Sequence, residues 1–281
     1  MTAAHPFRFL ALSLAALISV AGCSSTASPA PTSASTAAPT GGATAAPAAT
    51  ATAVPPSASP AAAFPRNPAP IETGTPYAVT IDSADFVEGI HHPFFPFTVG
   101  ATFVFDGAEH VEVTVLPDEK VILGVKVTVV RDQVFEDGEL IEDTLDWYAE
   151  DRDGNVWYFG EKTAEYENGK VTSTAGSWEG GVDGAQPGIV MLAVPQAGDE
   201  YRQEFYAGEA EDMATIVATT GDVAVPAGTW SGADVLVTDE WTPLEPDVRE
   251  RKTYVRGFGV VKIEVIKGGD EVTTLTSAKI P

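Results

Sequence analysis

The sequence predicts an all-β fold, built on one large curved antiparallel sheet (a half-barrel or a sandwich) with at most short helices. Three observations support this prediction. Apolar and polar residues alternate with period two over many segments. Glycine, Asn and Asp stand between these segments, where hairpin turns need positive φ. No segment shows the apolar spacing of a sustained amphipathic helix.

The alternation begins with apolar residues at every second position of 111–115 and again of 121–129. Residues 117–119, Pro-Asp-Glu, lie between the two runs, so we expect the first turn there. Glu136-Asp137-Gly138 predicts the turn that follows the second run.

A third strand places Ile141, Leu145 and Trp147 on one face, and it ends at the turn-forming residues 151–155. Residues 156–159 return as a fourth strand. The pair Asn168-Gly169 then favours a type I′ hairpin turn. The first half of the sheet is therefore predicted to be a meander of at least five strands.

The glycine-rich residues 180–184 predict a loop after Trp178, and strands resume beyond it. A short helix is expected at 83–89, with Asp82 or Ser83 as its N-cap. The later predicted strands are Glu200 to Tyr206, Met213 to Thr219, Ala233 to Thr238, Arg251 to Tyr254, Gly259 to Ile266 and Glu271 to Thr276. A sheet of this size must curl, close or stack on another sheet to bury its apolar face.

The first 22 residues have the pattern of an export signal. Arg8 precedes an apolar run from Phe9 to Ile18, which is too short to span a bilayer, and small residues follow it. Val20-Ala21-Gly22-Cys23 resembles the lipobox of bacterial lipoproteins. That resemblance implies cleavage before Cys23, lipidation of its thiol with a diacylglyceryl group, and a palmitate-type acyl anchor in the membrane.

Cys23 is also the one cysteine of the chain, so no intramolecular disulfide can form. Residues 24–63 contain Ser, Thr, Ala, Pro and Gly together with Val54, and this composition predicts a disordered linker. The expected organisation is a signal peptide at 1–22, the lipidated cysteine and tether at 23–70, and a single acidic β-rich domain at 71–281.

The predicted domain is strongly acidic. All 40 Asp and Glu residues lie within 71–281, whereas Arg8 and Arg66 of the 16 basic residues lie outside it. A domain with 14 basic and 40 acidic residues is repelled by nucleic acid and by anionic lipid headgroups. We therefore expect no nucleic-acid partner, and contact with the membrane through the lipid anchor alone.

Three stretches resemble a group of uncharacterised secreted bacterial lipoproteins. These are residues 92–105, His-Pro-Phe-Phe-Pro-Phe-Thr-Val-Gly-Ala-Thr-Phe-Val-Phe; residues 225–230, Val-Pro-Ala-Gly-Thr-Trp; and residues 254–262, Tyr-Val-Arg-Gly-Phe-Gly-Val-Val-Lys. The first departs from that group's pattern at His91-His92, where a polar residue and Asn are usual. The resemblance implies no catalytic residues. The layout is also similar to lipoprotein half-barrels that hold acyl chains, an analogy at the level of fold.

One candidate metal site contains Asp82, Asp85, Glu88 and His91, whose carboxylate and imidazole groups suit zinc or another divalent cation. The alternative is a solvated acidic turn. The start of a calcium loop is present at 151–155, but the closing Glu is missing, so a simple β-turn explains these residues better.

Trp147 and Trp157 lie on adjacent predicted strands and are the candidate ligand-binding residues. They either line a pocket for an apolar molecule or fill the core. No G-x-S-x-G elbow occurs, and residues 176–180 are only similar to one.

Together these patterns predict an extracytoplasmic, membrane-anchored lipoprotein of the cell envelope that acts as a binding or scaffold module and is not an enzyme. We expect no cofactor, and we expect an apolar small molecule or an envelope protein as its partner. Two alternatives stay open: an extracytoplasmic cell-wall hydrolase and a calcium-assisted adhesion module.

Replacing Cys23 with Ser removes the predicted acylation site, so the Cys23→Ser protein should leave the membrane fraction and appear in the soluble fraction. Cell fractionation with immunodetection measures this, and labelling with a radioactive fatty acid shows whether the acyl group is lost. A Cys23→Ser protein that stays with the membrane would contradict the lipoprotein prediction.

Overall fold

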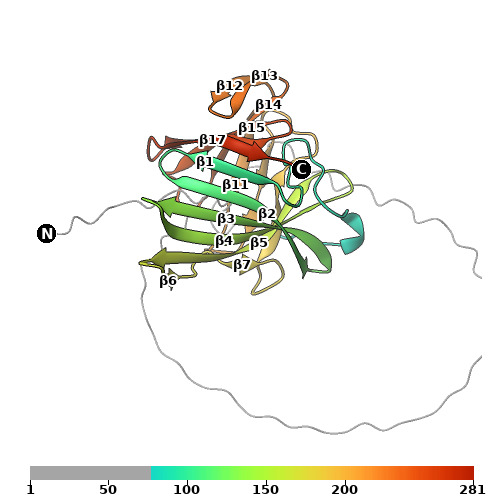
Figure 1. Ribbon diagram of the computed structural model, residues 1–281. Coiled ribbons are helices and arrows are strands. Elements are labelled where there is room, and N and C mark those ends of the chain that lie inside the picture. Colours follow the sequence, from blue (N-terminus) through green and yellow to red (C-terminus); the bar gives the residue numbers. More distant parts are fainter. Residues whose placement is uncertain (1–76) are drawn as a thin grey trace, which may run out of the picture. The chain divides into compact units, whose positions relative to one another are not determined.

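The computed structural model describes residues 77–281 (Figure 1), so the predicted signal peptide, Cys23 and the tether lie outside the described residues. Fifteen strands form one antiparallel sheet, and two more form a separate hairpin. The first strands are β1 (Thr102–Asp106), β2 (His110–Ile122), β3 (Val125–Glu136), β4 (Glu139–Glu150), β5 (Val156–Glu167), β6 (Lys170–Ser173), β7 (Trp178–Glu179) and β8 (Gln186–Met191). The later strands are β9 (Glu200–Arg202), β10 (Glu204–Phe205), β11 (Met213–Ala218), β12 (Gly221–Val225), β13 (Gly228–Gly232), β14 (Val235–Trp241), β15 (Arg249–Val255), β16 (Gly259–Lys267) and β17 (Val272–Lys279).

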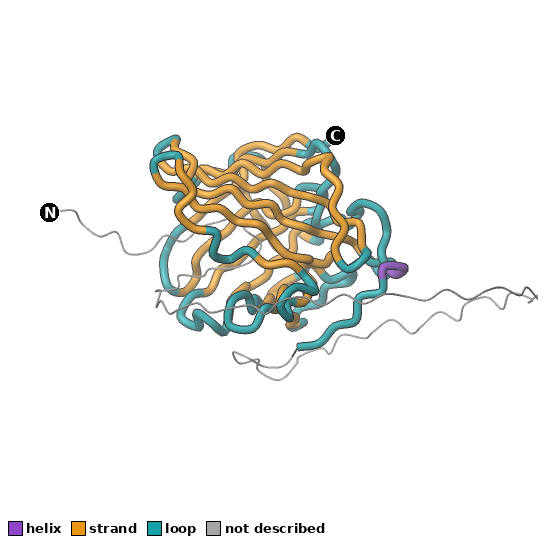
Figure 2. Tube along the Cα trace, turned by 90° about the horizontal axis from the view of Figure 1, so that it is seen from below, coloured by secondary structure: helices purple, strands orange, loops and turns teal. Residues whose placement is uncertain are grey.

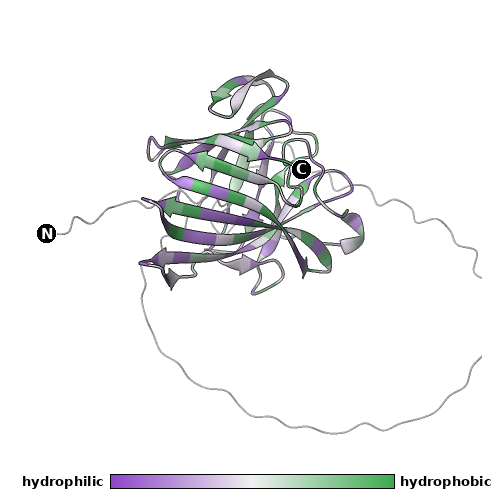
Figure 3. Ribbon diagram, in the orientation of Figure 1, coloured by the Kyte–Doolittle hydropathy of each residue, from purple (hydrophilic) through white to green (hydrophobic). Residues whose placement is uncertain are grey.

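The all-β prediction is confirmed. Along the sheet the order is β10-β8-β5-β4-β3-β2-β1-β17-β16-β15-β14-β11-β9, so two meanders are joined where β1 pairs with β17. Hydrophobic and hydrophilic residues alternate along the strands, as Figure 3 shows. Within residues 77–281, no helix is long and apolar enough to cross a membrane.

The two edges of the sheet meet on one short segment, which we call the seam (residues 200–205). β9 pairs with β11, and β10, which begins two residues after β9 ends, pairs with β8. The sheet therefore curls until its edges are nearly joined. Of the two arrangements that the sequence left open, this is a half-barrel carried almost to closure.

Curling gives the sheet an enclosed inner face. The charge of Lys252 on β15 acts on Asp132 on β3, although β2, β1, β17 and β16 separate these strands along the sheet. Both side chains are buried. Successive side chains of a strand point to opposite faces, so Val130 and Val134, each two positions from Asp132 on β3, also face inward. The residues between them face outward.

Hairpin turns lie at three pairs in which both residues have positive φ. The turns at Asp137-Gly138 and Asn168-Gly169 confirm the prediction. The third turn, at Leu123-Gly124, is not among those predicted from the sequence. The turn expected at 117–119 is wrong. Those residues belong to β2, where the register with β3 shifts between Val115 and Glu119. The two runs read as separated by this turn are instead one strand and the start of its partner.

The helix expected at 83–89 is shorter than predicted. Only the 3-10 turn η1 (Ser83–Asp85) forms, with Asp82 as N-cap accepting a hydrogen bond from the Ala84 amide. It is the one helical segment of the described residues and is coloured purple in Figure 2. Phe86 then forms a bridge to Asp151, which ends helical geometry because the backbone is extended there.

The seam can be tested at Gly188 of β8. A Cβ atom there would lie 2.3 Å from the carbonyl carbon of Gln203, so Gly188→Ala must push the seam away from β8. We expect a loss of several kcal/mol in the free energy of unfolding, measured by urea titration. Gly138→Ala is the control: its Cβ meets open space, and its positive φ should cost only about 1 kcal/mol. Equal losses at the two positions would contradict the close approach of the edges.

Candidate functional site

A cavity of about 30 Å³ lies inside the curled sheet, more than the minimum volume needed to hold one water molecule. Aromatic residues form most of its wall, and two acidic residues, Asp132 and Asp146, also line it. The rings belong to Phe95, Phe97, Phe103, Phe105, Tyr148 and Phe258, and the remaining lining residues are Val113, Val130, Gly259 and Val260.

Phe95, Phe97 and Phe258 form what we call the roof of the cavity. Phe97 and Phe258 are partly exposed, whereas Phe95 is buried. The ring of Phe95 packs edge-on against two other rings, with 4.4 Å between ring centres for Phe97 and 5.3 Å for Tyr148. The roof is therefore the side of the cavity nearest to solvent.

Contacts between distant segments hold the roof together. The Gly257 amide donates a hydrogen bond of 2.7 Å to the Pro93 carbonyl. The guanidinium of Arg256 lies 4.7 Å from the centre of the Phe94 ring, a cation–π contact. Trp230 of the β12–β13 hairpin packs on Phe258 with ring centres 4.9 Å apart. The three stretches quoted above for their resemblance thus meet at one place.

The structure explains why a glycine, Gly259, stands in the third of these stretches. Its φ is +76°, and a Cβ atom there would lie 3.2 Å from Cδ of Pro96. A larger residue would be strained and would press on the segment that carries Phe95 and Phe97. Glycine therefore allows β16 to begin directly beneath the roof.

The two cavity carboxyls begin a row of buried acids on the inner face. Asp132 lies on β3, Asp146 on β4, Glu161 on β5 and Glu204 on β10. All four are buried, and Asp146 pairs in register with Glu161. Oδ1 of Asp132 has no hydrogen-bond partner among the described residues.

A tyrosine hydroxyl joins two members of this row. Oη of Tyr158 lies 2.7 Å from Oδ1 of Asp146 and 3.0 Å from Oε2 of Glu161. The hydroxyl has one hydrogen to donate, so both contacts are hydrogen bonds only if one carboxyl is protonated and donates in return. The pair therefore retains a proton in the folded state.

Burial is the main reason why these acids hold protons. It raises the pKa of Asp146 to about 7. Burial, followed by the charge of Asp146, raises the pKa of Asp132 and of Glu161 well above their ordinary values. The pKa of Glu204 is raised by burial and then by the charge of Asp212. Low dielectric surroundings disfavour each carboxylate, and each charge that forms opposes the next.

The charge of Lys252 acts on Asp132 in this row, but Lys252 is already paired. Its Nζ lies 2.7 Å from Oε2 of Glu240, and Tyr254 and Thr238 donate hydrogen bonds to the same carboxylate. Lys252 and Glu240 thus form a neutral pair, so the charge of Lys252 is largely balanced by Glu240 and not by the row.

The structure places the predicted metal ligands in other roles. Asp82 caps η1, and Glu88 forms an exposed ion pair with Lys126 at 3.0 Å. Nε2 of His91 is 3.1 Å from the Glu88 carbonyl oxygen, and Asp85 is exposed. Among residues 77–281, no group of three or more His, Cys, Asp or Glu side chains is arranged to hold a metal ion. Metal binding at these four residues stays a prediction.

Trp147 and Trp157 are buried on the outer face, because their neighbours Asp146 and Tyr158 point inward. Nζ of Lys120 lies 3.9 Å above the Trp147 ring. Nε1 of Trp157 donates a hydrogen bond of 2.7 Å to Asp151. The structure does not bring these two residues to the cavity.

Two further motifs have structural roles. Asp151 accepts hydrogen bonds from the amides of Asp153 and Asn155, as in an Asx-type turn. Its carboxylate therefore organises the loop at 151–155, whose sequence resembles the start of a calcium loop. The Ser177 hydroxyl donates to the Thr163 carbonyl and accepts from the Thr163 amide, which docks it on β5.

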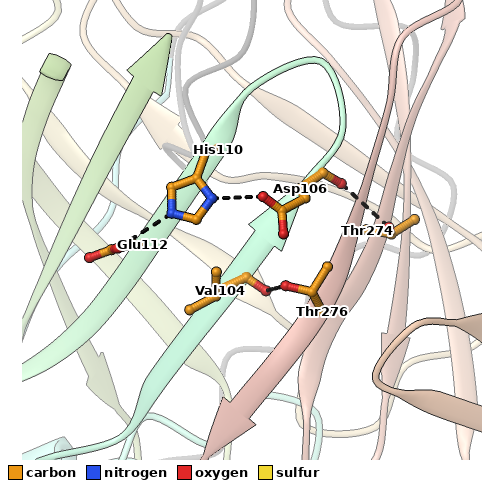
Figure 4. A network of polar contacts seen from close by, with 6 residues as sticks. All are labelled: Val104, Asp106, His110, Glu112, Thr274 and Thr276. Atoms are coloured by element: carbon orange, nitrogen blue, oxygen red, sulfur yellow. Dashed lines mark hydrogen bonds and ion pairs between the residues drawn. The ribbon is translucent and has the colours of Figure 1, made fainter. Parts of the chain in front are cut away.

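A second polar cluster lies at the surface near the β1–β2 turn (Figure 4). Nδ1 of His110 is 2.7 Å from Asp106, and Nε2 is 3.3 Å from Glu112. The hydrogen bond to Asp106 raises the pKa of His110. Thr276 and Thr274 donate to the carbonyls of Val104 and Asp106, which ties the cluster to β17. Its side chains are mostly exposed, so it is a weaker candidate than the cavity.

Sequence reasoning missed Asp132 and Asp146. The available signal was positional: Asp132 occupies an inward position of a strand in which Val130 and Val134 are also buried. An acid at an apolar position of an alternating strand contradicts the pattern, and such contradictions concentrate at functional sites.

No protein-family model and no curated protein matches the chain. Two solved structures are similar to it. One is a protein from Bacteroides fragilis NCTC 9343, inferred to be exported and to have a YmcC-like fold; it is 14% identical, with a TM-score of 0.42, over 67% of this chain and 100% of that one. The other, from Parabacteroides distasonis ATCC 8503, is inferred to be a lipoprotein; it is 12% identical, with a TM-score of 0.37, over 66% of this chain and 98% of that one. Likenesses this low assign no activity.

The buried acids predict a pH dependence of stability. The folded pKa of Asp146, about 7, lies above its ordinary value of 3.8, so its stabilising contribution is complete at low pH and is lost as the pH rises through 7. The Asp146→Asn variant should lack this term. Its stability relative to the natural protein should therefore rise between pH 5 and pH 8, by up to about 1.4 kcal/mol per pH unit below the folded pKa.

Urea unfolding at several pH values measures the difference. Asp143→Asn, on the outer face of the same strand, is the control and should leave the slope unchanged. His92 changes stability with pH in the opposite direction, because burial lowers its pKa to about 4. Since His92 is present in both proteins, the difference in stability between the variant and the natural protein cancels its contribution. The groups that interact with Asp146 are Tyr158, Glu142, Asp132, Tyr148, Glu161 and Glu204. Identical slopes for Asp146→Asn and the natural protein would contradict a proton held at Asp146.

Proposed function

We propose that the protein is a membrane-anchored binding module of the cell envelope, in which the cavity inside the curled sheet holds a small ligand. The observation that supports this most strongly is the convergence of three distant stretches on the roof formed by Phe95, Phe97 and Phe258. The location rests on the export signal and on Cys23. Lipidation at Cys23 would hold the acidic domain at the extracytoplasmic face of the membrane.

The lining supports a binding role more than a purely structural one. A sheet that only needed a stable core would fill its interior with apolar side chains, because a buried carboxyl costs free energy unless it is paired. Here Asp132 and Asp146 face the cavity, and Oδ1 of Asp132 lacks a partner among the described residues. A ligand that supplied the missing partner would offset this cost.

The hydrolase alternative receives less support. Glycoside hydrolysis needs two carboxyls that flank a sugar, with space between them. Asp146 and Glu161 are neighbouring acids on the inner face, but the Tyr158 hydroxyl lies between their oxygens and occupies the space that a sugar would need. We therefore favour binding over hydrolysis.

Truncating the roof should impair binding. We expect at least one compound from a panel of small amines, alcohols and hydrocarbons to raise the melting temperature saturably, since a ligand that binds the folded state stabilises it. Phe258→Ala should reduce this shift because it opens the roof. Phe135→Ala removes a partly buried ring near His110, away from the cavity, and should retain the shift.

Differential scanning fluorimetry of the purified full-length protein in detergent measures these shifts. The proposal fails if no compound in the panel shifts the melting temperature of the natural protein. It also fails if Phe258→Ala responds as the natural protein does.

A further inference from the structure

We propose that the ligand is a small free primary amine in its ammonium form, with its nitrogen between Asp132 and Asp146 and its short carbon chain against the phenylalanine rings. This inference rests on the proposed binding function and names the class of ligand. It follows from the charge, the hydrogen-bonding capacity and the size of the cavity, taken in turn.

The charge of the surroundings selects a cation. Asp132 and Asp146 face the cavity, and Glu161 and Glu204 continue the acidic row behind them. Lys252 is neutralised by Glu240 at 2.7 Å. An anionic ligand would oppose ionisation of these carboxyls in a low-dielectric interior. A cation would favour their ionised forms, so its binding would release protons that the acids otherwise hold.

Hydrogen bonding selects a cation that can donate. Asp132 lines the cavity, and its Oδ1 is fully buried without a hydrogen-bond partner among the described residues. Oδ1 of Asp146 already accepts from Tyr158. A primary ammonium has three donors and can satisfy Asp132 while also reaching Asp146. A quaternary ammonium has none, and a hydrocarbon would leave the Asp132 oxygen unsatisfied.

The size and the walls of the cavity select a short chain. Its volume of about 30 Å³ matches an ammonium group with one or two carbons and not an acyl chain. The rings of Phe95, Phe97, Phe103 and Phe258 present apolar surface to the carbons, and an ammonium near a ring face gains a cation–π attraction. The cavity is therefore complementary to ethylammonium at both of its ends.

Titration with ethylammonium chloride tests the inference. Isothermal calorimetry and the melting temperature of the purified full-length protein at neutral pH should show saturable binding. Sodium chloride at equal ionic strength controls for screening, ethanol for the uncharged isostere, and tetramethylammonium chloride for a cation without donors. These three compounds should bind at least about tenfold more weakly, because each lacks a charge-assisted hydrogen bond or the apolar chain.

Asp132→Asn should weaken ethylammonium binding by about tenfold or more, since it removes the charged acceptor. This variant should fold, because it replaces a carboxyl that is costly to bury with a neutral group of similar shape. Asp143→Asn removes a carboxylate from the outer face of neighbouring β4 and should bind ethylammonium as the natural protein does. It controls for non-specific attraction to the acidic surface.

Three results would overturn the inference: no binding of ethylammonium, equal binding of ethanol or tetramethylammonium, or unchanged binding by Asp132→Asn. If a neutral compound binds in a Phe258-dependent manner while ethylammonium does not, the ligand class is wrong but the binding function stands. If neither amines nor neutral compounds bind, both proposals fall.

Discussion

The pairing of both sheet edges with the seam, residues 200–205, is the constraint on which the rest of the structure depends. An antiparallel sheet of this size has two edges with unpaired backbone groups, and closure is the most complete way to protect them. Because β9 and β10 are consecutive in the chain, one segment satisfies both edges. Curling also removes water from the inner face, and the loss of water raises the pKa values of the acids in the buried row.

Exclusion of water changes what the carboxyl groups can do. On the outer face, Asp143 and Asp239 form bidentate ion pairs with Arg131 and Arg251, an arrangement common at protein surfaces. On the inner face, Asp146 instead holds its proton to about pH 7. The same residue type is thus a charged surface group on one side of the sheet and a proton-holding group on the other.

The roof shows how local sequence and tertiary structure combine at the cavity. Aromatic residues near Phe95 have little meaning alone, because any apolar segment of this kind could fill a core. Their arrangement depends on the β15–β16 turn, where the Gly257 amide binds Pro93, and on Trp230, which supports Phe258. Segments separated by more than 100 residues therefore determine which rings face the cavity. The proposed ligand would contact residues from both meanders at once.

The sequence by itself determined the fold class, most strands and the hairpin turns at Asp137-Gly138 and Asn168-Gly169, because side-chain alternation and positive-φ residues act over a few positions. It failed at residues 117–119, where a shift of register inside β2 has the composition of a turn. It also missed the β12–β13 hairpin, whose short strands, Gly-Asp-Val-Ala-Val and Gly-Thr-Trp-Ser-Gly, alternate weakly.

Only the tertiary structure decided which face of each strand became the interior. Trp147 and Trp157 occupy the outer face, and Asp132 and Asp146 occupy the inner one, although alternation alone treats the two faces as equivalent. The direction in which the sheet curls distinguishes them. That direction depends on the pairing of β1 with β17 and on the seam, contacts between residues far apart in the chain that no local pattern encodes.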